Sequence, residues 1–176
     1  VAVNYEGYSP ENYDEKFNGY VTVETALEHS LNIPAVKGLK MLGHETMIQK
    51  LSNCNFKQIQ KDRRKLGLSL ILGGCGTTLE ELTGLFSSFA NNGILITPSY
   101  VSTDRSDRDG QTAISPAANY MINEILSKVN RPDFPLNWTA TERMPKIAWK
   151  TGTSYGKKDA WSIGYNKNYT VGIWTG

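Results

Sequence analysis

Residues 146–176 constrain the fold most strongly, because three strand-like runs follow one another there with very short links. The runs cover Lys146–Tyr155, Asp159–Tyr165 and Tyr169–Thr175, and the links read Gly-Lys-Lys and Asn-Lys-Asn. Short turns of this kind join neighbouring antiparallel strands. We therefore expect an antiparallel three-strand meander at this end of the chain.

The residues before the meander place apolar side chains at helical spacing instead. Thr22 is a suitable N-cap for a first helix that ends near His29. Pro34 is expected to keep Ile33 out of the second helix, because a residue before proline disfavours the helical conformation. Further helices are predicted over about 34–42, 44–51, 79–90 and 116–130. Helices followed by antiparallel strands indicate an α+β fold.

The length of 176 residues fits one domain with a sizeable core. We divide it into a lead-in over 1–20, a mainly helical part over 21–145 and the strands of 146–176. The lead-in is aromatic and rich in turn formers, and we expect its tyrosines and Phe17 to hold it against the rest. The chain starts without methionine and stops inside a strand-like run, so we expect it to be a fragment of a larger protein.

Composition excludes several classes of function. A formal net charge of +2 is too small for nucleic acid or an anionic membrane as the main partner. No apolar run approaches the roughly 20 residues that span a bilayer. Two histidines and two cysteines without a Cys-x-x-Cys pair do not make a familiar zinc set, so we expect no metal and no cofactor. Whether Cys54 and Cys75 pair with each other stays open.

Two short motifs carry polar chemistry: Ser30-Leu31-Asn32, and Lys150-Thr151-Gly152-Thr153-Ser154 on the first expected strand. Taken alone, the first also fits an ordinary helix break, and the second fits an exposed edge strand whose lysine prevents aggregation. Together, and in this order, they resemble two of the three elements of penicillin-recognising serine acyltransferases, which are Ser-x-x-Lys, Ser-Asp-Asn and Lys-Thr-Gly.

Longer segments extend this resemblance over most of the chain. YSPENYDEKFNGYVTVETALEHSLNIPAVK and LGLSLILGGCGTTLEELTGLFSSFANNG resemble the transpeptidase domain of class A penicillin-binding proteins. KTGTSYGKKDAWSIGY resembles most of all the 1C type of that family. The resemblance implies part of a β-lactamase/transpeptidase-like fold, and a D,D-transpeptidase that crosslinks peptidoglycan through a serine acyl-enzyme.

The resemblance also implies a role for each motif residue. Ser30 would relay protons, and Asn32 would hydrogen-bond the stem-peptide amide. Lys150, Thr151 and Thr153 would bind the terminal carboxylate of D-Ala-D-Ala or of a β-lactam, with the Thr153 N–H as half of the oxyanion hole. Gly152 would keep the strand edge open to substrate, and Ser154 would be a further substrate-binding residue of this strand.

The chain departs from the family in its first motif. No Ser-x-x-Lys precedes Ser30, so we expect the nucleophile and its lysine to lie before Val1, and the isolated chain to be inactive. Ser154 and Lys157 have the right spacing, but they span a strand end and a hairpin, whereas the pair needs a helical turn. We expect a partner chain, a contact with a second copy or a rearrangement of the chain to cover the apolar face left by this truncation.

Two rival functions remain beside the transpeptidase. A D,D-carboxypeptidase or a β-lactamase uses the same motifs with water as the acceptor, and a stem-peptide binding module would need no nucleophile. Membrane attachment through an upstream segment, an upstream glycan-polymerising domain and a periplasmic location in the cell envelope are implied by the resemblance only.

Overall fold

The computed structural model describes residues 4–5, 7–101, 110–129, 146–154, 156 and 158–176. The helices and strands that the sequence predicts occur in the predicted order, together with elements that it does not predict. The helical part contains α1 (Val23–Glu28), α2 (Asn32–Leu42), α3 (His44–Asn53), α4 (Lys57–Asp62), the short 3-10 helices η1 (Arg63–Lys65) and η2 (Leu68–Leu72), α5 (Leu79–Ala90) and α6 (Pro116–Leu126). Two short strands, β1 (Ile94–Leu95) and β2 (Gln111–Thr112), pair between α5 and α6.

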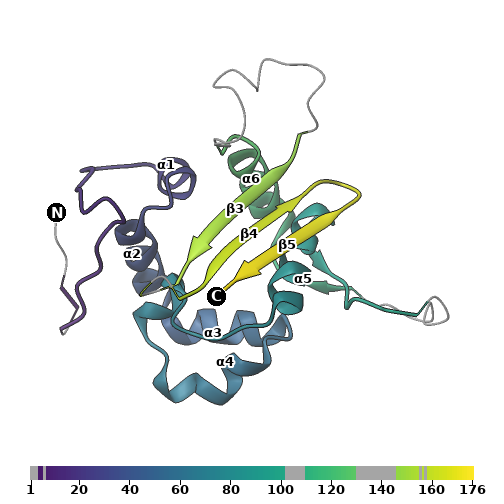
Figure 1. Cartoon of the computed structure of the whole chain (residues 1–176), viewed down its shortest axis with the longest axis horizontal. Coiled ribbons are helices and arrows are strands. Elements are labelled where there is room, and N and C mark those ends of the chain that lie inside the picture. Colours follow the sequence, from purple (N-terminus) through teal and green to yellow (C-terminus); the bar gives the residue numbers. More distant parts are fainter. Residues whose placement is uncertain (1–3, 6, 102–109, 130–145, 155, 157) are drawn as a thin grey trace.

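The C-terminal meander is confirmed. Strands β3 (Ala148–Thr153), β4 (Ala160–Tyr165) and β5 (Thr170–Thr175) form one antiparallel sheet in the order β3-β4-β5. Lys150 pairs with Ile163, and Ile163 pairs with Gly172. In Figure 1, α5 and α6 lie behind this sheet, α3 and α4 lie below it, and α1 and α2 lie beside β3. The α+β architecture is therefore as expected.

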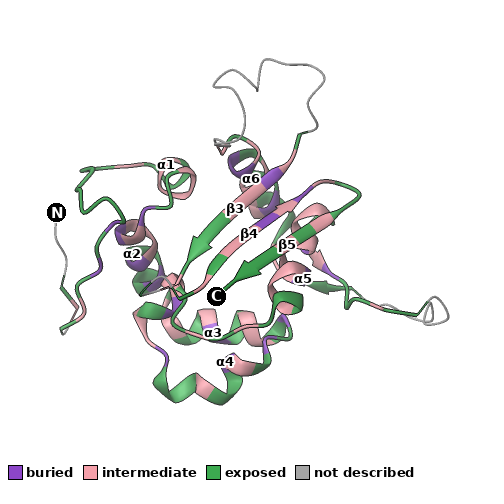
Figure 2. Ribbon diagram, in the orientation of Figure 1, coloured by how far each residue is buried: buried purple, intermediate pink, exposed green. Residues whose placement is uncertain are grey.

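Two apolar clusters make the core. The helical cluster includes Leu39, Ile48 and Phe56, from α2, α3 and the start of α4. The sheet cluster includes Leu126, Ala148 and Tyr165, with Phe86 and Phe89 of α5 packed against them. Burial within the sheet cluster raises the pKa of the Tyr165 phenol above its usual range. Most of β5 and the end of β3 nearest α2 stay exposed (Figure 2).

Hydroxyl side chains cap the starts of α1, α5 and α6, as predicted for Thr22 of α1. The Thr22 side chain accepts from the N–H of Thr25, and Thr78 forms a reciprocal capping box with Glu81. Ser115 caps α6 in the same way, with Pro116 in the first turn. These local devices use only neighbours along the chain, which is why the sequence reveals them.

One expectation was wrong, and a second was right only in part. The second helix begins at Asn32, so Ile33 is helical in spite of Pro34. Asn12 explains the difference, because its side-chain oxygen accepts from the Ile33 N–H at 3.2 Å and stabilises the first turn from outside. The lead-in is held by some of its aromatic residues only: Tyr5 and Tyr8 are half-buried, whereas Phe17 is 54% exposed and Tyr20 is fully exposed. Asn12 is buried there instead.

Both cysteines are free thiols. Cys54 is buried in the helical cluster, and Cys75 packs against that cluster. Burial raises the pKa of both thiols, and at Cys75 the carboxylates of Asp62 and Glu81 add to the effect. No helix within the described ranges is long and apolar enough to cross a membrane.

Candidate functional site

The site is built around the short link between α1 and α2. The Ser30 N–H donates to the Leu27 carbonyl at 3.2 Å, and the Leu31 N–H donates to the Ala26 carbonyl at 2.9 Å. This pair of bonds is a Schellman motif, which ends a helix with one left-handed residue that is usually glycine. Ser30 occupies that position with φ +53°. Such strained conformations gather at functional sites, so the serine side chain is a candidate for function.

Lys150 on β3 meets this serine. Its Nζ donates to Ser30 Oγ, across 120 residues of sequence, and also to the Thr151 carbonyl at 2.8 Å. The lysine is half-buried, and this desolvation lowers the pKa of its ammonium group. A lysine with a lowered pKa beside a hydroxyl can pass a proton more readily than a free surface lysine. The structure thus brings the two sequence motifs together.

The strand that carries Lys150 presents an open edge. Among the described strands, β3 has a neighbour on one side only, and its Thr151, Gly152 and Thr153 are exposed. A Cβ added at Gly152 would meet no atom within 4 Å. Gly152 and Lys150 share one face of the sheet, because alternate residues of a strand point the same way. The space directly over Gly152, beside the lysine, is therefore free.

Asn32 lies in the first turn of α2, two residues after Ser30. Its Nδ2 donates to the Glu11 carbonyl at 2.8 Å. That bond orients the amide and leaves Oδ1 without a donor among the residues that the structure describes. The free oxygen can accept from an amide N–H of a bound molecule.

Asn12 supports this turn and was missed by the sequence analysis. Besides holding Ile33, it donates from Nδ2 to the Lys16 carbonyl at 2.7 Å. It ties the lead-in to the helix that carries Asn32. An asparagine in a turn-rich stretch is typical of a surface turn, so nothing local signalled its buried position.

Ser154 closes the link between β3 and β4. Its Oγ donates to Asp159 Oδ2 at 2.6 Å and accepts from the Asp159 N–H at 3.0 Å. Trp174 Nε1 donates to the other carboxylate oxygen at 3.0 Å. These hydrogen bonds, that of Ser154 first, hold the pKa of Asp159 below its ordinary value. Lys157, which has Ser-x-x-Lys spacing from Ser154, lies outside the described residues. Among the residues that are described, no cluster of His, Cys, Asp or Glu could hold a metal ion.

Comparison with known proteins agrees with the motifs. Residues 3–176 match the family model "Penicillin binding protein transpeptidase domain". The chain is 36% identical over 173 residues to penicillin-binding protein 1C of Escherichia coli, covering 96% of this chain and 21% of that protein. It is 31% identical over 182 residues to penicillin-binding protein 4 of Bacillus subtilis, covering 96% of this chain and 28% of that protein. The chain thus spans about a fifth to a quarter of the length of these relatives.

Solved structures show the same fold. Penicillin-binding protein 1A from Haemophilus influenzae superimposes with a TM-score of 0.77 at 18% identity, over 99% of this chain and 33% of that chain. PonA1 from Mycobacterium tuberculosis gives a TM-score of 0.80 at 16% identity, over 99% and 52%. PonA1 has also been solved in complex with penicillin V, with a TM-score of 0.75 at 17% identity, over 98% and 52%. The chain therefore belongs to the family of penicillin-binding protein transpeptidase domains.

Proposed function

We propose that this chain forms one wall of a serine D,D-transpeptidase site that crosslinks peptidoglycan stem peptides and is blocked by β-lactams. The observation that carries the proposal is the contact between Lys150 Nζ and Ser30 Oγ at the open edge of β3. A lysine and a hydroxyl in contact form a proton relay, and an unpaired strand edge offers backbone groups to an extended peptide.

Each motif residue has a role in this proposal. Ser30 relays the proton, and the free Oδ1 of Asn32 accepts from the stem-peptide amide. The terminal carboxylate binds to the ammonium of Lys150 and the hydroxyls of Thr151 and Thr153. The Thr153 N–H supplies one half of an oxyanion hole, which stabilises the charge on the tetrahedral intermediate. Gly152 leaves room for the substrate, and Ser154, bound to Asp159, fixes the end of that strand.

The attacking serine is proposed to come from a segment outside these 176 residues. Within them, the only Ser-x-x-Lys is Ser154 to Lys157. Ser154 is held by Asp159 through both its hydroxyl and its N–H, so it is a poor candidate for the nucleophile. The isolated chain is then inactive, while the full-length protein acts at the periplasmic face of the cell envelope.

Labelling with a fluorescent penicillin tests the proposal. The full-length protein should acquire a covalent label that resists denaturation, and the isolated 176-residue chain should acquire none. A label on the isolated chain, mapped to Ser154, would overturn the assignment of the nucleophile. Crosslinked stem-peptide dimers would identify a transpeptidase, whereas release of D-Ala without dimers would identify a carboxypeptidase.

One surface feature agrees with a larger assembly. Val171 and Ile173 of β5 are 59% and 56% exposed, and they lie on the same face of the sheet. Gly172 between them faces α5, where an added Cβ would lie 2.1 Å from Thr83 Oγ1. The outer face of the sheet is therefore apolar and open at β5. We propose that a further segment of the parent protein or a second copy covers it.

A further inference from the structure

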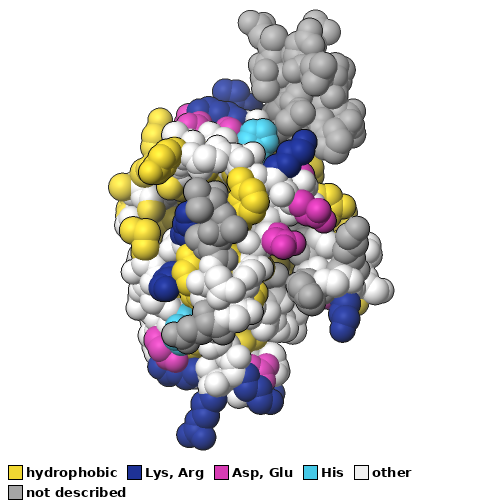
Figure 3. Space-filling model, turned by 90° about the vertical axis from the view of Figure 1, so that its left-hand side faces the viewer, with side chains coloured by type: hydrophobic (Ala, Val, Ile, Leu, Met, Phe, Trp, Pro, Cys, Tyr) yellow, Lys and Arg dark blue, Asp and Glu magenta, His cyan; other side chains and the backbone are white. Residues whose placement is uncertain are grey.

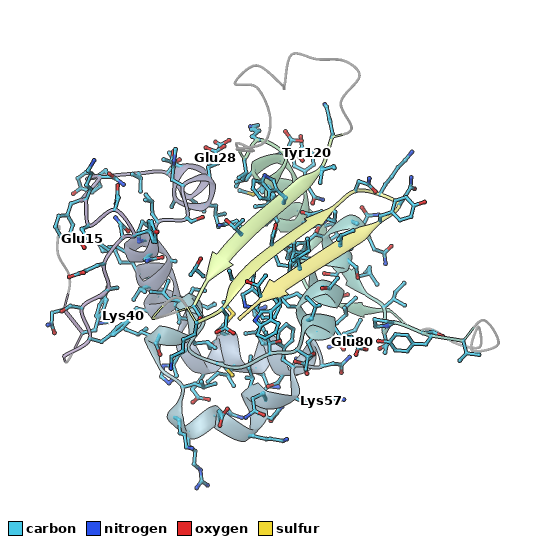
Figure 4. The ribbon with its side chains drawn as sticks, viewed as in Figure 1. Glu15, Glu28, Lys40, Lys57, Glu80 and Tyr120 are labelled. Atoms are coloured by element: carbon cyan, nitrogen blue, oxygen red, sulfur yellow. The ribbon has the colours of Figure 1, made fainter. Side chains whose placement is uncertain are left out.

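A second polar hollow lies where α2 ends and α3 begins, and it shares no residue with the site around Ser30 and Lys150. Its volume is about 500 Å³, within the range of small-molecule sites. Its lining includes Tyr5, Tyr8, Lys40, His44, Lys65 and Ser69. Figure 4 labels Lys40 at the end of α2 near α3, and Figure 3 shows that side of the molecule, where lysine and arginine side chains (dark blue) lie among aspartate and glutamate side chains (magenta).

The hollow is one-sided in charge. Two lysines and one histidine line it, and no aspartate or glutamate does so among the described residues. Within the same residues, no carboxylate lies within ion-pair distance of Lys40 or Lys65. Glu45 lies 3.7 Å from His44 and also forms an ion pair with Arg63 at 2.7 Å. The positive charges of Lys40 and Lys65 are therefore without an ion-pair partner among the described residues.

The side chains are also held in place. Lys40 Nζ lies 4.3 Å from the centre of the Tyr5 ring, a cation–π contact that restrains it over the hollow. Tyr5 and Tyr8 exchange two backbone hydrogen bonds, of 2.8 and 2.9 Å, which fix the turn that carries both rings. A pre-positioned ammonium loses less freedom on binding than a mobile one.

Backbone groups add to the same charge. Helix α3 starts at the hollow, with Gly43 as an N-cap that has no side chain to accept from the first N–H groups. The start of a ten-residue helix carries partial positive charge and unpaired N–H donors. The Ser69 and Tyr8 hydroxyls are further donors in the lining. Charge and donors both favour a compact anion with several oxygens.

We propose that this hollow binds a multivalent oxyanion, the phosphate or polycarboxylate group of a small ligand. Lys40 and Lys65 supply the charge, and the α3 N–H groups with Ser69 supply directed hydrogen bonds. The proposal rests on these residues alone and stands whether or not the transpeptidase assignment is correct.

Calorimetric titration of the full-length protein with pyrophosphate and, separately, with citrate tests it at fixed ionic strength. We expect saturable binding with a Kd of about 1 mM or tighter to at least one of them. Replacing both lysines, Lys40→Gln with Lys65→Gln, should weaken binding at least about tenfold. Binding of pyrophosphate alone would assign a phosphate ligand, and binding of citrate alone a polycarboxylate ligand.

The matched control is Lys37→Gln with Lys50→Gln, which removes equal charge from exposed positions of α2 and α3 outside the lining. This variant should bind as the wild type does. Equal weakening in both variants would mean that only net charge matters, and would overturn the proposal. So would the absence of saturable binding by the wild type, which decides the question even if a variant does not fold.

Discussion

Replacing Ser30 by glycine and by alanine separates its backbone from its hydroxyl. Both variants lose the hydrogen bond from Lys150, so that loss cancels in their comparison. They differ at φ +53°, where alanine keeps the left-handed strain and glycine does not. A left-handed residue with a Cβ costs about 1–2 kcal/mol, and the extra freedom of glycine in the unfolded chain offsets part of this. Ser30→Gly should therefore be more stable than Ser30→Ala by about 1 kcal/mol.

Acylation should respond differently. Neither variant has a hydroxyl to relay a proton, so both should lose about 10²–10⁴-fold in the rate of penicillin acylation, by similar factors. Urea unfolding gives the free energy of unfolding. Labelling of the full-length protein with a fluorescent penicillin, quenched at a series of times, gives the rate of acylation. Ser30→Ala as stable as Ser30→Gly would refute the strain. Wild-type rates in either variant would refute the role of the hydroxyl.

Three further substitutions probe the sheet. Gly152→Ala should leave the free energy of unfolding unchanged or raise it slightly, because the added Cβ meets no atom. It should slow penicillin acylation about five- to a hundred-fold, because the Cβ narrows the space for the substrate. The control is Gly164→Ala, whose Cβ lies on the opposite face 3.4 Å from the nearest atom and should leave the acylation rate unchanged. Burial lowers the pKa of Lys150, so the charged lysine destabilises the fold at neutral pH, and this destabilisation fades toward pH 10.5. In unfolding experiments across that range, the wild type should gain stability relative to Lys150→Met as the pH rises. A stability difference that stays constant with pH would contradict this. Hydrogen bonds from Ser154 and Trp174 lower the pKa of Asp159, so its carboxylate stabilises the fold above its ordinary pKa of 3.8 and loses this effect as the pH falls through the lowered pKa. The stability difference between the wild type and Asp159→Asn should therefore shrink in acid unfolding experiments. A difference that persists in acid would show that the charge is not involved.

The elements of the fold were predictable where their causes are local. The period of two in β3, β4 and β5, their short links and the hydroxyl caps Thr22 and Thr78 all depend on near neighbours. The start of α2 was not predictable, because its first turn is stabilised by Asn12, 21 residues away. Proline at position 34 disfavours a helical Ile33 locally, and the distant hydrogen bond outweighs that preference.

The candidate site was predictable in its residues and not in its geometry. Resemblance to a known family singled out Ser30, Asn32 and Lys150, but the sequence does not reveal that Lys150 contacts Ser30 directly. The left-handed conformation of Ser30 also escaped prediction, since glycine, not serine, usually marks such a position. The bond between Ser154 and Asp159 needed the hairpin geometry before it could be seen.

The separation of 120 residues between Ser30 and Lys150 has a consequence for the order in which the chain folds. The helical cluster around Leu39 and Ile48 closes through short loops, and the three-strand meander closes through still shorter ones. Joining the two requires a much longer loop, whose closure entropy is larger and slows the step. Secondary structure should therefore recover first on refolding, and the pair should meet late. The ability to react would then appear only when folding is complete. A partly folded chain would contain helices and the sheet, but it would not bind its ligand.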